Sequence, residues 1–140
     1  MFRPSFLAAA LGAALVLGAC SSDEATGHGH TPHEAKLFVG ATELTAPYQF
    51  DAGQTVRVEI KFYDHDGAEL VGLDADHFSA IVFSPNTLAT VAAVAGEPFQ
   101  WDVTAQAAAG SGTVSVNWGH DAAADDLSFG PFNVDVVAAP

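Results

Sequence analysis

Residues 55–63 read TVRVEIKFY, a strict alternation of apolar and polar side chains. Successive side chains of a β-strand point to opposite faces, so the apolar set from Val56 to Phe62 shares one face and the charged set from Arg57 to Lys61 shares the other. The stretch predicts a strand with one buried and one solvated face. We expect Val58 and Ile60 to lie in the core.

Six further segments have β-type composition and are separated by Gly, Pro, Asp or Asn. They are residues 36–44, 78–83, 88–94, 99–105, 113–118 and 129–137. Seven short strands within about 100 residues, without a convincing amphipathic helix, predict an all-β, antiparallel β-sandwich, in which Val116 is a further core residue. Residues 68–73, AELVGL, are apolar enough to form an additional strand.

The N-terminal 20 residues have the layout of a secretion signal. Arg3 supplies one positive charge, and residues 6–17 form an apolar or small-residue run that is shorter than the ~17–25 residues needed to span a bilayer. Leu17-Gly18-Ala19-Cys20 follows this run and is similar to the lipobox of bacterial lipoproteins. A plain secretory signal with a chance cysteine, or a buried apolar helix, are the alternatives.

The lipobox resemblance implies removal of residues 1–19 as a signal peptide and acylation of Cys20, which becomes the N-terminus. It therefore implies a membrane partner reached through a lipid anchor and a location in the cell envelope. Ser21 follows the cysteine, which resembles the sorting pattern for the outer membrane if the organism is Gram-negative. The only thiol is then lipidated, which excludes an internal disulfide and a cysteine nucleophile.

The remaining 121 residues carry all 17 acidic side chains and three of the four basic ones, a formal charge of −14. A field of this sign repels nucleic acid and attracts cations, so we expect no nucleic-acid partner. Residues 20–35 are polar and without hydrophobic period, which predicts a flexible tether ahead of a domain at residues 36–140. This tether contains His28, His30 and His33.

Four strings along the chain resemble a bacterial immunoglobulin-like domain. They are residues 55–67 with the turn Asp64-His65-Asp66-Gly67, then 83–91 (FSPNTLATV), 109–116 (AGSGTVSV) and 132–136 (FNVDV). The second is similar to the S-x-P-x-x-A-T-V turn and strand of that family, and the third to A-G-T-A-x-I-x-V. The family's usual tryptophan is absent before Ser84, where Val82 and Phe83 stand. The resemblance implies an immunoglobulin-like sandwich and concerns fold more than function.

The six histidines lie in the tether and in the connections between expected strands. His65 and His77 flank the connection after residue 63, and His120 opens the last connection. If both connections share one end of the sandwich with the incoming tether, these side chains meet there. A strand at residues 68–73 would instead place His77 and His120 at one end and His65 with the tether at the other.

Histidine with carboxylate suits zinc or copper, so all six histidines are candidate ligands. Asp64, Asp66 and Asp121 are candidate carboxylate ligands. Calcium is the weaker expectation, because residues 64–67 do not fit the calcium-loop spacing, and a hairpin turn with Gly67 at positive φ fits them better. The same connections also have the composition of ordinary solvated loops.

Catalytic motifs are missing from the sequence: it contains no HExxH string, nucleophile elbow or phosphate-binding glycine loop. Tryptophan in such strands more often packs in the core or an interface than lines a sugar-binding face, and we expect this of Trp101 and Trp118. We therefore expect a non-enzymatic, lipid-anchored protein that binds a divalent transition metal. The alternative is an adhesion or interaction module that contacts an unidentified envelope protein and has no specific metal role.

Overall fold

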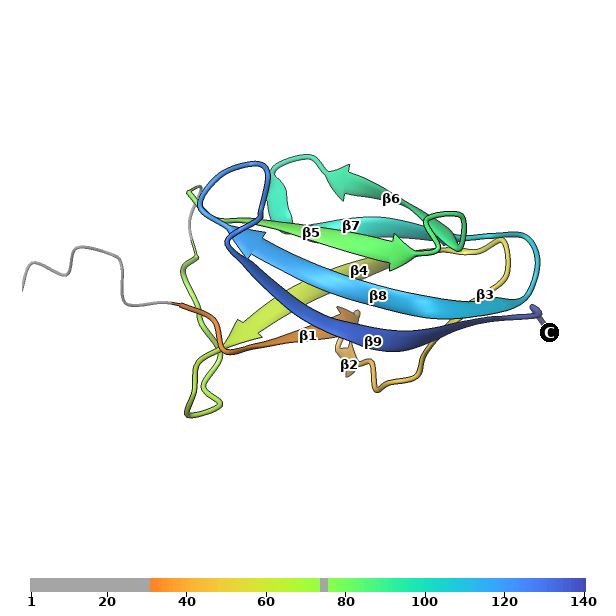
Figure 1. Cartoon of the computed structure of the whole chain (residues 1–140), viewed down its shortest axis with the longest axis horizontal. Helices are drawn as coiled ribbons and strands as arrows, with labels where there is room; N and C mark the ends of the chain where they lie inside the picture. Colours follow the sequence, from red (N-terminus) through yellow and green to blue (C-terminus); the bar gives the residue numbers. More distant parts are fainter. Residues whose placement is uncertain (1–30, 74–75) are drawn as a thin grey trace, which may run out of the picture.

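Nine strands make up the regular structure of the computed structural model, which describes residues 31–73 and 76–140 (Figure 1). They are β1 (Glu34–Val39), β2 (Thr42–Glu43), β3 (Tyr48–Asp51), β4 (Thr55–Tyr63), β5 (Phe78–Ser84), β6 (Ala89–Val94), β7 (Glu97–Ala105), β8 (Gly110–Gly119) and β9 (Leu127–Val137). Within these residues no helix is long and apolar enough to cross a membrane.

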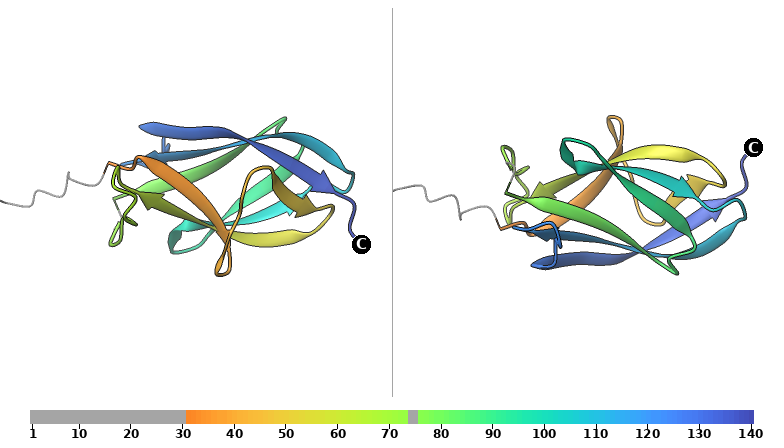
Figure 2. Two further views of the ribbon diagram at one scale, coloured as in Figure 1. Left: turned by 90° about the horizontal axis from the view of Figure 1, so that it is seen from below. Right: turned by 90° about the horizontal axis from the view of Figure 1, so that it is seen from above.

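The strands form two sheets that pack face to face, as Figure 2 shows from two sides. One sheet has the order β2-β1-β4-β7-β6 and the other β3-β9-β8-β5. Without the short strands β2 and β3, the orders β1-β4-β7-β6 and β9-β8-β5 are those of the ABED and GFC sheets of an immunoglobulin-type sandwich. The predicted all-β sandwich is confirmed.

Each of the seven expected segments contains a strand, and β4 has the expected bounds. The structure differs in its short elements. Residues 36–44 divide into β1 and β2 around Gly40, whose φ of 60° suits the turn between them. β3 was not expected, since four residues give too little alternation to recognise. It pairs parallel with β9, so the sandwich is not wholly antiparallel.

The core lies between the inner faces of the sheets. Val58, Ile60 and Val116, the expected core residues, are all buried. Phe62 packs edge-on against Phe99, with ring centroids 5.7 Å apart, and joins the two sheets through Phe129 at 5.8 Å. The alternation that predicted the β4 strand therefore also determines which side chains hold the sandwich together.

β1 begins at Glu34, two residues before the expected start of the domain at residue 36. Glu34 pairs with Tyr63 and Ala35 with Phe62, while the backbone N–H of His33 donates to the carbonyl of Tyr63 at 2.8 Å. The physical reason is burial, because Ala35 and Leu37 both face the core. This pairing places the start of β1 beside the end of β4.

Candidate functional site

Three segments meet at one end of the sandwich, which we call the pole. They are the start of β1, the connection after β4 (described at residues 64–73 and 76–77) and residues 120–126 between β8 and β9 (Figure 1). The β1–β4 register pairs Glu34 with Tyr63, and the β5–β8 register pairs Phe78 with Gly119. Residues 68–73 form no strand, and only one isolated bridge joins Tyr63 to Glu69.

The rings of His77, Trp118 and His120 pack together at the pole. Their centroids are 4.9 Å apart for the two histidines, 5.2 Å for His77 and Trp118, and 4.7 Å for Trp118 and His120. Trp118 and His120 are two positions apart at the end of β8 and so point to the same side. His77 directly precedes the paired strand β5. Both Trp118, at 2% exposure, and His77, at 8%, are buried.

Asp126 fixes the ring of His120. Its Oδ2 atom lies 2.7 Å from Nδ1 of His120 and also accepts the backbone N–H of His120 at 2.9 Å. The hydrogen bond from the His120 ring, followed by that from its backbone, lowers the pKa of Asp126 below its ordinary value. An ionised carboxylate accepts hydrogen bonds only, so Nδ1 carries the proton. In the neutral ring, Nε2 then holds the lone pair that can bind a metal.

The connection 120–126 is folded back onto the end of β8. Ala124 is fully buried and has a φ of 48°. A Cβ atom at Gly119 would lie 2.7 Å from the Cα of Ala124, so this position has room only for glycine. Oδ1 of Asp121, a candidate ligand, accepts the backbone N–H of Ala123 at 2.8 Å. Asp121 therefore acts in the turn that presents His120 and Asp126.

The connection after β4 is built differently. Oδ1 of Asp64 accepts the backbone N–H groups of Asp66 and Ala68, both at 2.9 Å, and the first cause of the lowered pKa of Asp64 is the bond from Ala68. Gly67 has a φ of 78°, which confirms the predicted turn. His65 has a side chain 73% exposed, and its Nε2 lies 3.3 Å from Oδ2 of Asp66. The carboxylate of Asp64 thus stabilises a turn.

The structure brings together two of the four described histidines. Within residues 31–73 and 76–140, no three or more His, Cys, Asp or Glu side chains are arranged as a metal site. His33 is exposed at the start of β1, and His65 lies at the tip of its turn. His28, His30 and Cys20 lie outside the described residues. Among the described histidines, His77 and His120 are the pair whose rings pack against each other.

Two residues were absent from the expected ligand set but shape this site. Trp118 was expected in the core, and its indole Nε1 is buried without a hydrogen-bond partner in the described part of the chain. Asp126 was one of several loop carboxylates. The spacing Trp118-x-His120, which puts both rings on one side of a strand end, is the sequence signal that links them.

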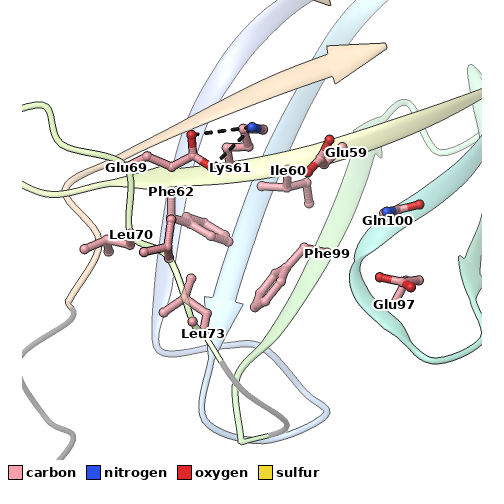
Figure 3. Close-up of a pocket in the computed structure, with 12 residues that line it drawn as sticks. Glu59, Ile60, Lys61, Phe62, Glu69, Leu70, Leu73, Glu97, Phe99 and Gln100 are labelled. Atoms are coloured by element: carbon pink, nitrogen blue, oxygen red, sulfur yellow. Dashed lines mark hydrogen bonds and ion pairs between the residues drawn. The ribbon is translucent and has the colours of Figure 1, made fainter. Parts of the chain in front are cut away.

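Two hollows are lined in part by the connections of the pole, the first by Glu69–Leu73 and the second by Ala122. The first, about 250 Å³, is enclosed by β4, β7 and the segment from Glu69 to Leu73, and Figure 3 shows its apolar floor at Phe62 and Phe99. Lys61 bridges its rim to Glu69 at 3.2 Å. The second, about 450 Å³, lies between the start of β5 and the β6–β7 hairpin.

Comparison with protein-family models, with curated proteins and with solved structures found no match to this chain.

Proposed function

We propose that the protein is a lipid-anchored, non-enzymatic protein of the cell envelope that binds a divalent transition metal, zinc or copper, at the pole. The observation that carries the proposal is the pair His77 and His120, with ring centroids 4.9 Å apart. It is supported by Asp126, because a carboxylate on the far nitrogen of a ligating histidine sets its tautomer and raises its basicity.

The tether histidines complete the proposed metal shell. Zinc takes three or four protein ligands, so the pair His77 and His120 needs further donors. His33 sits where β1 enters the pole, bonded through its backbone to Tyr63. His28 and His30 precede it in the sequence by five and three residues, and with His33 they are the donors that we propose for the remaining positions. We assign no ligand role to Asp64, Asp66 or His65, because the carboxylate of Asp64 bonds the backbone of the turn and the exposed side chains of Asp66 and His65 lie beside each other at its tip.

Calorimetric titration of the purified chain with zinc or copper salts tests the metal proposal. We expect one saturable site at about pH 7.5 that weakens toward about pH 5, because imidazole must lose its proton to bind. His120→Ala should abolish saturable binding, and Asp126→Asn should weaken it about 10–100-fold, the usual effect of removing an outer-shell partner. His65→Ala is the matched control and should bind as the parent does.

A triple variant of His28, His30 and His33 to alanine tests the tether. Loss of affinity in both this variant and His120→Ala indicates a shared site. Loss in the triple variant alone would place binding in the tether and overturn the role of the pole.

The anchor is tested separately. Cys20→Ala should block acylation, so the protein should leave the membrane fraction, since stable attachment requires more than one acyl chain or a second signal. Mass spectrometry of the parent should find residues 1–19 removed and acyl mass on Cys20. A soluble product cleaved elsewhere would contradict the lipoprotein assignment.

An interaction module is the second candidate function. It is favoured by two uncharged strands, β5 and β6, that end their sheets. If neither the parent protein nor any variant binds metal saturably, the interaction module is the remaining proposed function.

A further inference from the structure

The side of the sandwich between β5 and β6 is open at the edges of both sheets. β5 ends the order β3-β9-β8-β5, and β6 ends the order β2-β1-β4-β7-β6, so within the described residues each has a strand neighbour on one side only. Figure 2, in its right-hand view, looks onto this side. The unpaired N–H and C=O groups of such an edge are a template for a further strand.

These two edges lack the charge and proline that often protect an exposed strand, although the pairing of β6 with β7 is irregular between Ala93 and Val94. Edge strands are commonly very short or carry charge or proline. The opposite edges follow this rule, since β2 has two residues and contains Glu43, while β3 has four and contains Asp51. β5, FSAIVFS, and β6, ATVAAV, contain no charged residue and no proline. The edges without charge or proline are therefore confined to one side of the described molecule, and β5 is the regular one of the two.

Two apolar hollows follow this side and define what we call the edge groove. The hollow of about 450 Å³ lies by Phe78, Val94 and Trp101, and a second of about 360 Å³ lies by Ile81, Val82 and Val91. Val82 and Val91 are exposed by 49% and 37%, unusual for large apolar side chains in this chain. Alternate side chains of one added strand, repeating every ~6.8 Å, would enter successive hollows.

The wall of the edge groove is already hydrogen-bonded. Ser79 on β5 donates to the carbonyl of Pro98 at 2.7 Å and accepts the indole N–H of Trp101 at 3.0 Å. These bonds tie the edge of one sheet to β7 of the other. The groove is thus a preformed surface, which reduces the ordering required of the protein when a strand binds.

Charge identifies the kind of strand that fits. The three basic side chains of the described chain lie on β1 and β4 and are paired with acids: Lys36 with Glu43, Arg57 with Asp102 and Lys61 with Glu69. The described lining of the edge groove has no basic residue and contains Glu97. At the end of the groove nearest the pole it is lined by Ala122, which follows Asp121 in the sequence. A partner with positive flanks complements this rim, whereas a second copy of this acidic chain meets repulsion.

We propose that the edge groove binds an extended protein segment with alternating apolar side chains and basic flanks, which adds as a strand to β5. Main-chain hydrogen bonds to β5 would provide affinity, and the two hollows would select the alternate side chains. The proposal gives the interaction-module alternative a surface and a partner class. Metal has no part in it, so failure of metal titration leaves it unaffected, and its own failure leaves the pole unaffected.

The test uses a synthetic peptide in which Val and Thr alternate between paired terminal lysines. We expect saturable binding to the purified chain and slower hydrogen exchange at β5 amides. Val82→Lys and Val91→Lys should each weaken binding by about tenfold or more, because they place charge in the hollow and repel the lysines. Val71→Lys is the matched control, since Val71 is 74% exposed and lies outside the groove.

Three results would overturn the proposal. Equal binding by Val82→Lys and the parent would place the peptide elsewhere. Equal binding of a peptide with glutamate in place of lysine would remove the charge argument. A dimer of the parent chain in sedimentation, lost in Val82→Lys, would show that a second copy occupies the groove.

Discussion

The two connections at the pole contain histidine and aspartate in similar numbers, but these side chains make different contacts in each. In residues 120–126, Ala124 is buried against Gly119 and Asp126 binds both the ring and the backbone of His120. In residues 64–73, Asp64 binds only backbone N–H groups of its own turn, and His65 points into solvent. His120 is held in place because it directly follows a strand and packs against the buried ring of Trp118. His65, at the tip of a turn, has no such ring beside it among the contacts of the described residues.

Removing the core ring should have the largest effect on this contrast. Trp118→Ala should lower the free energy of unfolding by ~3–5 kcal/mol, because it leaves a cavity under His77 and His120. Urea unfolding measures the loss. Trp118→Phe keeps an aromatic ring in the cluster and should lose less. A Trp118→Ala protein as stable as the parent would show that the ring does not anchor the pole.

Gly119 and Gly67, one at each connection, should respond differently to alanine. Gly119→Ala should cost ~1–3 kcal/mol and displace His120, because the new Cβ meets backbone atoms of Ala124 and Asp125 at 2.7–3.1 Å. Gly67→Ala meets no atom within 4 Å and suffers only its positive φ, a penalty of ~1–2 kcal/mol. Thermal unfolding together with NMR shifts of the His120 ring measures both effects. Movement of His120 in Gly67→Ala but not in Gly119→Ala would reverse the comparison.

The fold was predictable because its signal is local, whereas the site depends on contacts across the chain. The alternation in residues 55–63 specified β4 and its buried face without any knowledge of its neighbours. The pairing of β3 with β9 joins Tyr48 to Val134, far apart in the sequence, and four residues carry little local signal. The approach of His77 to His120 follows from the β5–β8 register, which places Phe78 opposite Gly119.

Loop carboxylates were the least predictable part. Asp121, Asp126 and Asp64 have the same chemistry in the sequence, and their roles diverge only through the backbone groups that each one meets. Composition identified an acidic, histidine-bearing pole, but it could not distinguish the carboxylate that orients a ring from those that close turns.

The smallest expected effect concerns the protonation of these carboxylates. Asp126 and Asp64 both have a pKa below the ordinary value of ~3.9, the first chiefly through His120 and the second chiefly through the backbone of Ala68. A lowered pKa stabilises the fold above the unfolded-state value, and that contribution disappears as pH falls through the folded-state pKa. Acid titration followed by carboxyl NMR should therefore find both groups still more than half ionised at about pH 3.9 and protonated only as pH falls further.

His120→Ala separates the two carboxylates. It removes the first cause of the Asp126 shift, so the pKa of Asp126 should rise toward its ordinary value, while the backbone-bonded Asp64 should titrate as before. The backbone N–H of residue 120 remains, so part of the Asp126 shift should persist. If the pKa of Asp126 does not move, its carboxylate is held by backbone alone, and the two connections at the pole stabilise their carboxylates in the same way.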